Sequence, residues 1–93
     1  MENGNGLVPI DRMNLLLQLD NYKLIAEMND HLFVDDPLVK EQLTLEFERL
    51  ENYLDEVERW EGQGECAKYN HAIVEAKTTI DYIRVLISEI LSR

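Results

Sequence analysis

The architecture of this chain is set by residues 66–90, which read CAKYNHAIVEAKTTIDYIRVLISEI and contain neither glycine nor proline. Apolar residues recur through this stretch at alternating spacings of three and four. The residues that share this spacing are Cys66, Tyr69, Ile73, Ala76, Ile80, Ile83, Ile87 and Ile90. Such an alternation, held over several heptads, is typical of an α-helix that buries one face against other helices. The pattern therefore predicts a long helix over about residues 65–92.

A second helix with the same pattern precedes this one. Its apolar residues are spaced alternately by four and three, at Leu43, Phe47, Leu50, Leu54 and Val57. Asp36 is suited to cap the start of this helix, and Pro37 suits its first position because the first helical residue needs no backbone N–H. Gly62 is able to take the left-handed conformation that ends helices. We therefore expect a helix over about residues 37–61 that forms an antiparallel hairpin with the last helix.

The first helix is predicted over about residues 9–32, starting at Pro9 after a flexible leader at residues 1–8. Its apolar residues cover more than one face, whereas a single hairpin covers only one side of a helix. We therefore expect a homodimer in which a second copy covers the surplus apolar surface. The alternative is a monomer in which part of this surface stays exposed. The candidate association residues are Leu15, Leu16, Leu19 and Tyr22.

Together these patterns predict an all-α fold of three helices in one domain over residues 9–93. The domain consists of a C-terminal antiparallel helical hairpin and an N-terminal helix, in a bundle completed by homodimerisation. Ninety-three residues are enough for one hydrophobic core. No apolar run reaches the roughly 18 residues of a membrane span, and residues 1–6 lack the pattern of a signal peptide. A cytoplasmic location is expected.

Acidic residues outnumber basic ones by nineteen to nine, which gives a net charge of −10. Such a charge argues against direct binding to nucleic acid or to an anionic membrane surface. The excess is concentrated in residues 36–61, which hold nine acids and three bases, whereas residues 62–93 hold four of each. Glu48, Asp55 and Glu58 are predicted to form an acidic face that steers a basic partner.

No catalytic, cofactor-binding or metal-binding residue is predicted. Cys66 is interpreted as a packed, inert thiol because it begins the apolar series of the last helix. The segment Glu48-x-x-Glu51 resembles the magnesium-binding helices of all-α nucleotide pyrophosphohydrolases. The matching Glu-x-x-Asp of that family is missing, because Glu75 is followed three residues on by Thr78. A solvated acidic face is therefore the preferred interpretation of these carboxylates.

The segment Trp60-Glu61-Gly62 lies where the predicted hairpin turns. It resembles the Trp-x-Gly motif that small secreted helical-hairpin proteins of the type VII secretion family place in their turn. The resemblance implies a secreted, dimeric helical hairpin. This chain departs from the family's pattern because an additional helix precedes the hairpin, and because no Tyr-x-x-x-Asp/Glu export signal follows the last apolar residue of the final helix.

We expect a small, acidic, non-enzymatic protein that acts as a homo-oligomer in protein–protein interaction or as an adaptor. Its expected partners are a second copy of itself and an unidentified basic protein, with neither nucleic acid nor membrane among them. One alternative is an acidic inhibitor or nucleic-acid mimic that sequesters a basic protein. A weaker alternative is a helical-hairpin protein like those of type VII secretion.

Overall fold

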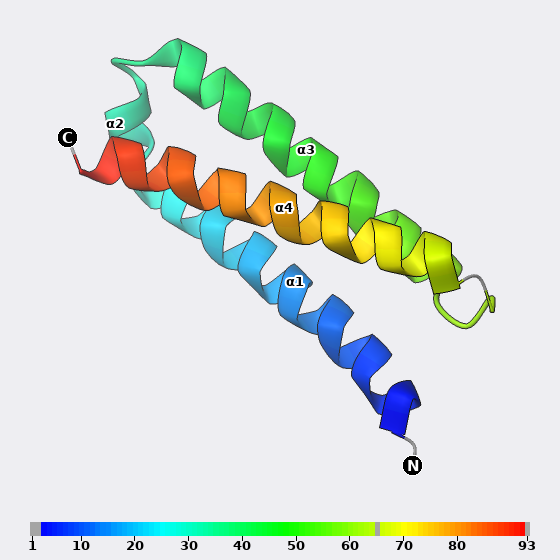
Figure 1. Ribbon diagram of the computed structural model, residues 1–93. Helices are drawn as coiled ribbons and strands as arrows, with labels where there is room; N and C mark the ends of the chain where they lie inside the picture. The colour runs from blue at the N-terminus through cyan, green and yellow to red at the C-terminus, as the bar shows by residue number, and fades with distance from the viewer. Residues whose placement is uncertain (1–2, 65, 93) are drawn as a thin grey trace.

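The computed structural model describes residues 3–64 and 66–92, with side chains from Arg12 onward. Figure 1 shows that the elements are helices throughout, and the described residues contain no strand. The helices are α1 (Asn3–Met28), α2 (Asp30–Phe33), α3 (Pro37–Trp60) and α4 (Cys66–Leu91). The predicted all-α class is therefore confirmed.

Helices α3 and α4 form the antiparallel hairpin that the sequence predicts, packed side by side along their length. Helix α1 packs against both of them and runs in the same direction as α4 (Figure 1). The N-terminal end of α1 therefore lies at the same end of the molecule as the hairpin turn, while α2 lies beside the C-terminal end of α4. The result is an elongated bundle with extents of 49 × 20 × 15 Å.

The first helix differs from its predicted boundaries at both ends. It ends at Met28, and α2 follows as a separate helix, because Asn29 leaves the helical conformation with φ −115° and ψ 22°. The Asn29 Nδ2 atom donates a hydrogen bond to the Ile25 carbonyl at 2.8 Å. Asparagine is disfavoured inside helices because its side chain competes in this way with the backbone for hydrogen-bond partners.

At its start, α1 begins at Asn3 and so includes most of the predicted leader, of which residues 1–2 lie outside the described part of the chain. Pro9 lies inside this helix, where a proline removes one backbone hydrogen bond. No described side-chain contact explains the earlier start.

The start of α3 follows the sequence prediction closely. Asp36 precedes the helix, and its Oδ1 atom accepts a hydrogen bond from the backbone N–H of Val39 at 3.3 Å. Pro37 occupies the first helical position, where its missing N–H leaves no partner unsatisfied. At the other end of the helix, Gly62 has a φ of +77°, a conformation that residues with a Cβ rarely adopt. These three residues set the bounds of the hairpin's first arm.

The core runs along the hairpin and is covered from one side by α1 and α2. From α4 it takes nearly the whole predicted apolar series, whereas Cys66 is exposed and Tyr69 is only half-buried. The interpretation of Cys66 as a packed thiol is therefore wrong, because the residue lies at the very start of α4, beyond the last residue of α3. The buried apolar residues are Leu15, Leu19, Phe33, Leu43, Leu50, Leu54, Val57, Ala72, Ile73, Ala76, Ile80, Ile83, Leu86, Ile87 and Ile90.

Candidate functional site

Helix α1 packs on the hairpin through the face that carries Leu15 and Leu19, which are only 2% and 4% exposed. Tyr22 is half-buried and packs against the same core. Three of the four residues predicted to associate with a second copy thus belong to the chain's own core. Only Leu16 remains exposed. The physical reason is that α1 has two apolar faces, and the hairpin covers the one that contains Leu15 and Leu19.

The opposite face of α1 carries a second apolar series that nothing in the described structure covers. Its four members are 53–69% exposed and follow one another at spacings of four, seven and four: Met13, Leu17, Leu24 and Met28. Because successive residues turn by about 100° around a helix, these side chains lie within about 60° of each other and point away from Leu15 and Leu19. We call these four residues the outer α1 stripe.

Two basic residues hold α1 against α3. Arg12 Nη1 lies 3.4 Å from Glu58 Oε2, and Arg12 Nε lies 3.4 Å from Glu61 Oε2. Lys23, further along α1, pairs with Glu51. The Arg12 Nε and Glu61 Oε2 atoms are buried and interact as an ion pair without hydrogen-bond geometry. Both bases in the described part of α1 are therefore directed at α3, away from the outer α1 stripe.

Replacing Arg12 with glutamine is expected to lower the free energy of unfolding by about 1 kcal/mol, because the change leaves the half-buried Glu61 without its cation. The measurement is urea denaturation followed by circular dichroism. The matched control is Arg84→Gln, which removes an exposed ion pair with Asp81 and is expected to change stability by less than about 0.5 kcal/mol. Equal effects of the two changes would contradict a role for Arg12 in holding α1 to α3.

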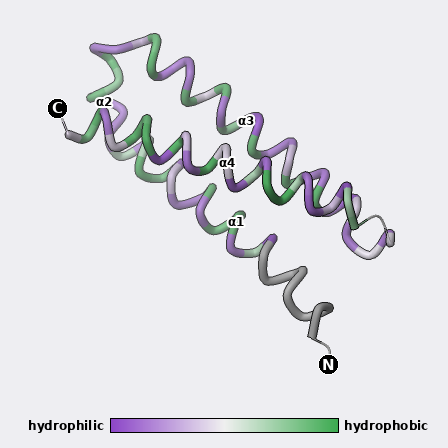
Figure 2. The backbone as a smooth tube through the Cα atoms, viewed as in Figure 1, coloured by the Kyte–Doolittle hydropathy of each residue, from purple (hydrophilic) through white to green (hydrophobic). Residues whose placement is uncertain are grey.

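The structure divides the acidic residues of α3 into two groups. Glu48 and Asp55 are exposed and make no ion pair within the described residues, as expected for an acidic face. Glu58 is exposed as well, but it is engaged by Arg12. Glu46 is buried, with its Oε2 atom 3.4 Å from Gln42 Nε2 and 3.6 Å from Arg49 Nη1, so it belongs to the packing of α3. Figure 2 shows the resulting hydrophilic character of α3 beside the more apolar α4.

The Lys23–Glu51 pair also defines which residues of α1 and α3 lie at the same level. Because the two helices run antiparallel, Asp20, three residues before Lys23, lies at the level of Asp55, four residues after Glu51. By the same register, Glu27 in α1 lies at the level of Glu48 in α3. One shallow hollow is lined by Glu27 together with Thr44 and Phe47 of α3, in agreement with this register. The exposed carboxylates Asp20 and Glu27 of α1 and Asp55 and Glu48 of α3 therefore lie at matching levels along the two packed helices.

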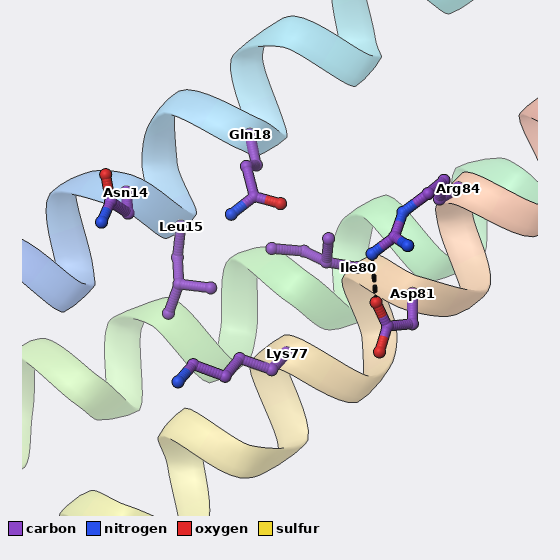
Figure 3. Close-up of a pocket in the computed structure, with 7 residues that line it drawn as sticks. All are labelled: Asn14, Leu15, Gln18, Lys77, Ile80, Asp81 and Arg84. Atoms are coloured by element: carbon purple, nitrogen blue, oxygen red, sulfur yellow. Dashed lines mark hydrogen bonds and ion pairs between the residues drawn. The ribbon is translucent and has the colours of Figure 1, made fainter.

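A second groove lies between α1 and α4 and is shown in Figure 3. Leu15 and Ile80 form its apolar part, and Asp81 pairs with Arg84 at its edge. This pairing leaves Lys77 as the only unneutralised charge in the groove. The groove therefore offers amide and charged side chains beside a small apolar surface. The residues that line it are Asn14, Leu15, Gln18, Lys77, Ile80, Asp81 and Arg84.

The turn of the hairpin carries the Trp60-Glu61-Gly62 segment. Trp60 is the last residue of α3 and is half-buried, and the Nζ atom of Lys68 lies 4.4 Å from the centroid of its ring. This is a cation–π contact that ties the first turn of α4 to the end of α3. The segment therefore closes the turn, which is the position at which the sequence places it.

The candidate metal ligands and the candidate nucleophile do not cluster in the part of the chain that the structure describes. No three His, Cys, Asp or Glu side chains among the described residues come together in a way that holds a metal ion. Cys66, His31 and His71 are each exposed. Glu48 is exposed to solvent while Glu51 is paired with Lys23, so the Glu48-x-x-Glu51 segment does not form a shared cation site.

Comparison with known proteins returns no relative: no family model, no curated protein and no solved structure matches this chain. A search of the described helices for a stretch with the length and hydropathy needed to cross a bilayer also finds none. The outer α1 stripe and the exposed carboxylates of α1 and α3 are therefore the features from which a function is argued. Spacing along α1 was the signal that could have located the stripe, since its four members already share one face of a helical wheel.

Proposed function

We propose that this protein is a non-enzymatic protein–protein interaction module or adaptor that docks its partner on the outer α1 stripe. The observation that supports this proposal is that α1 is apolar on two opposite faces, of which the hairpin covers one. Four apolar side chains that are each roughly half exposed gain about 1 kcal/mol apiece when a partner buries them. An exposed apolar series along one helix face is a feature of interaction sites rather than of an ordinary solvated helix.

A homodimer, as predicted from the sequence, would use this same surface. Two copies would bury their stripes together for a gain of about 8 kcal/mol, which is of the same order as the 4–15 kcal/mol that association costs in lost freedom. The contact would also bring together Asp20 and Glu27 from both copies. Homodimerisation therefore remains a prediction, which we now place at the stripe instead of at Leu15, Leu16, Leu19 and Tyr22, and the expected result for an isolated pair of stripes is weak association.

An acidic inhibitor or nucleic-acid mimic is a second candidate function, supported by the unpaired Glu48 and Asp55 on α3. Its support is weaker than the sequence indicates, because Glu58 is engaged by Arg12 and the row of free carboxylates is correspondingly shorter. The type VII secretion-like alternative is supported only by the position of Trp60 and Gly62 at the turn. A cytoplasmic location belongs to the main proposal as its expected setting.

The proposal is tested with the double variant Leu17→Gln/Leu24→Gln. Because both side chains are exposed, we expect the free energy of unfolding to change by less than about 0.5 kcal/mol per substitution. Capture of host proteins on the immobilised protein, and self-association measured by light scattering, are expected to be lost together with the stripe.

The matched control is Leu38→Gln/Leu45→Gln, which removes two exposed leucines from α3 instead. We expect this control to retain every association of the unmodified protein. If the α1 and α3 variants capture the same proteins and show the same mass, the outer α1 stripe is not the docking surface.

A further inference from the structure

We infer that the partner docked on the outer α1 stripe is a basic amphipathic helix. This inference rests on the proposed function and adds the chemistry of the partner to it. The stripe runs from Met13 to Met28, which corresponds to about 22 Å of helix at 1.5 Å per residue. A second helix of similar length, laid along α1 with its own apolar residues against the stripe, matches this surface in shape and extent.

The charge of the outer face of α1 is entirely acidic. Between Met13 and Met28 the exposed charged residues are Asp20 and Glu27. Lys23 is the one base in this interval, and it is held by Glu51 of α3. A partner that lies along the stripe therefore meets carboxylates and no available cation, which favours lysine and arginine on the partner's flanks.

These carboxylates lie on the side of the stripe that faces α3. Lys23 points toward α3, and on the helical wheel Glu27 and Asp20 lie between Lys23 and the stripe. The register of the two helices then adds Asp55 at the level of Asp20, and Glu48 at the level of Glu27. The apolar stripe is thus bordered along one edge by Asp20 and Glu27, and Asp55 and Glu48 of the neighbouring helix lie at the same two levels, about two helical turns apart.

The other edge of the stripe, on the side of α4, has a different character. It carries the exposed amides Asn14 and Asn21 and no exposed charge from α1. A partner helix that is basic along one flank and uncharged along the other would therefore bind in one orientation, with its basic flank toward α3. Methionines at both ends of the stripe, Met13 and Met28, adapt their shape to the side chains that they meet.

A second copy of the chain fits this surface less well than a basic helix does. It would bring the same apolar residues, but also the same Asp20 and Glu27 and no base on this face of the helix. The net charge of −10 on each copy opposes their approach. Charge complementarity therefore favours a basic helix over a second copy of the chain, although both would bury the same stripe.

The test uses a fluorescent synthetic peptide of about 18 residues with leucine at helical spacings of three and four and lysine at the flanking positions. A second peptide has glutamate in place of every lysine, and a third has the composition of the first in a scrambled order. Binding to the full chain is measured by fluorescence anisotropy. We expect the lysine peptide alone to bind, and its Kd to rise at least about tenfold between roughly 0.05 and 0.5 M NaCl.

Two matched pairs of variants locate the binding site. Asp20→Asn/Glu27→Gln is expected to weaken binding of the lysine peptide about five- to tenfold, and Leu17→Gln/Leu24→Gln about thirtyfold or more. Asp81→Asn/Glu89→Gln removes the same charges from α4, and Leu38→Gln/Leu45→Gln removes two exposed leucines from α3. Both control variants are expected to bind the lysine peptide within about twofold of the unmodified protein.

Four outcomes would overturn the inference. If the α1 and α4 charge variants weaken binding equally, the attraction is a property of the net charge and not of this surface. If the scrambled lysine peptide binds as well as the amphipathic one, the stripe does not contribute. If no peptide binds but the protein self-associates in a way that Leu17→Gln/Leu24→Gln abolishes, the docking surface stands and its partner is a second copy. If neither peptide nor copy depends on Leu17 and Leu24, the proposed function fails as well.

Discussion

Replacing Leu50 with alanine is expected to lower the free energy of unfolding by about 3 kcal/mol. Leu50 lies in the middle of α3, is completely buried, and is among the largest side chains of the core with no exposed surface. Truncating it removes apolar contacts along the hairpin and leaves a cavity that rigid helices fill only in part. In a domain of this size such a loss is a large share of the total stability, so a considerable fraction of molecules should unfold.

The measurement is chemical denaturation with urea, followed by circular dichroism and by the fluorescence of the single tryptophan, Trp60. Leu45→Ala is the matched control, because Leu45 lies in the same helix and is 53% exposed. It is expected to change the free energy of unfolding by less than about 0.5 kcal/mol. A cost below about 1 kcal/mol for Leu50→Ala would contradict the packing of α3 described above.

The same substitution, leucine to glutamine, is expected to lower the free energy of unfolding at one position of α1 and to leave it nearly unchanged at another. Leu19→Gln places an amide in the core between α1 and the hairpin, and should cost about 3 kcal/mol through lost apolar burial and a poorly satisfied polar group. Leu17→Gln, two residues earlier, changes a side chain that points to solvent and should be nearly neutral. Thermal denaturation of the two variants measures this difference directly.

Amide hydrogen exchange measures which helices lose stability in the Leu19→Gln variant. Helix α1 meets the hairpin through one face, whereas α3 and α4 share most of the core, so α1 is expected to open first. Amides of α1 should therefore lose more protection than those of α4. If Leu17→Gln were the more destabilising change, the face of α1 that packs on the hairpin would be the opposite one, and the outer α1 stripe would be part of the core.

The hairpin was predictable because its local signals and its tertiary packing agree. In α4 the residues of the regular three–four series share one face, which is the face that the structure buries, while Val74, Tyr82 and Val85 lie outside that series and are exposed. Asp36 and Pro37 mark the start of α3 by chemistry that acts within one helical turn. Because the turn that contains Gly62 is short, α4 has to pack antiparallel beside α3. None of these conclusions needs information from a distant part of the chain.

The sequence prediction assigned Leu15 and Leu19 to a contact with a second copy, whereas the structure buries them in the chain's own core, and this difference has a physical reason. Periodicity shows which residues share a face, but it does not rank two apolar faces of one helix against each other. Leu15 and Leu19 pack inward because this orientation also brings Arg12 to Glu58 and Glu61, and Lys23 to Glu51. Such pairs join residues far apart in the chain, and their formation depends on the distance between packed helices.

The proposed docking surface has the same mixed origin, partly local in the chain and partly tertiary. An excess of apolar residues in the first helix and an excess of acid in the second follow from composition and spacing, which are local properties of the chain. That the two excesses occur in neighbouring helices follows from the packing of α1 against α3, in which Asp20 and Glu27 lie at the levels of Asp55 and Glu48. Helix formation depends on neighbours within a turn or two, and so it can be inferred from a linear pattern. The choice of which face to bury is made by the whole core at once, and for α1 only the folded molecule contains that information.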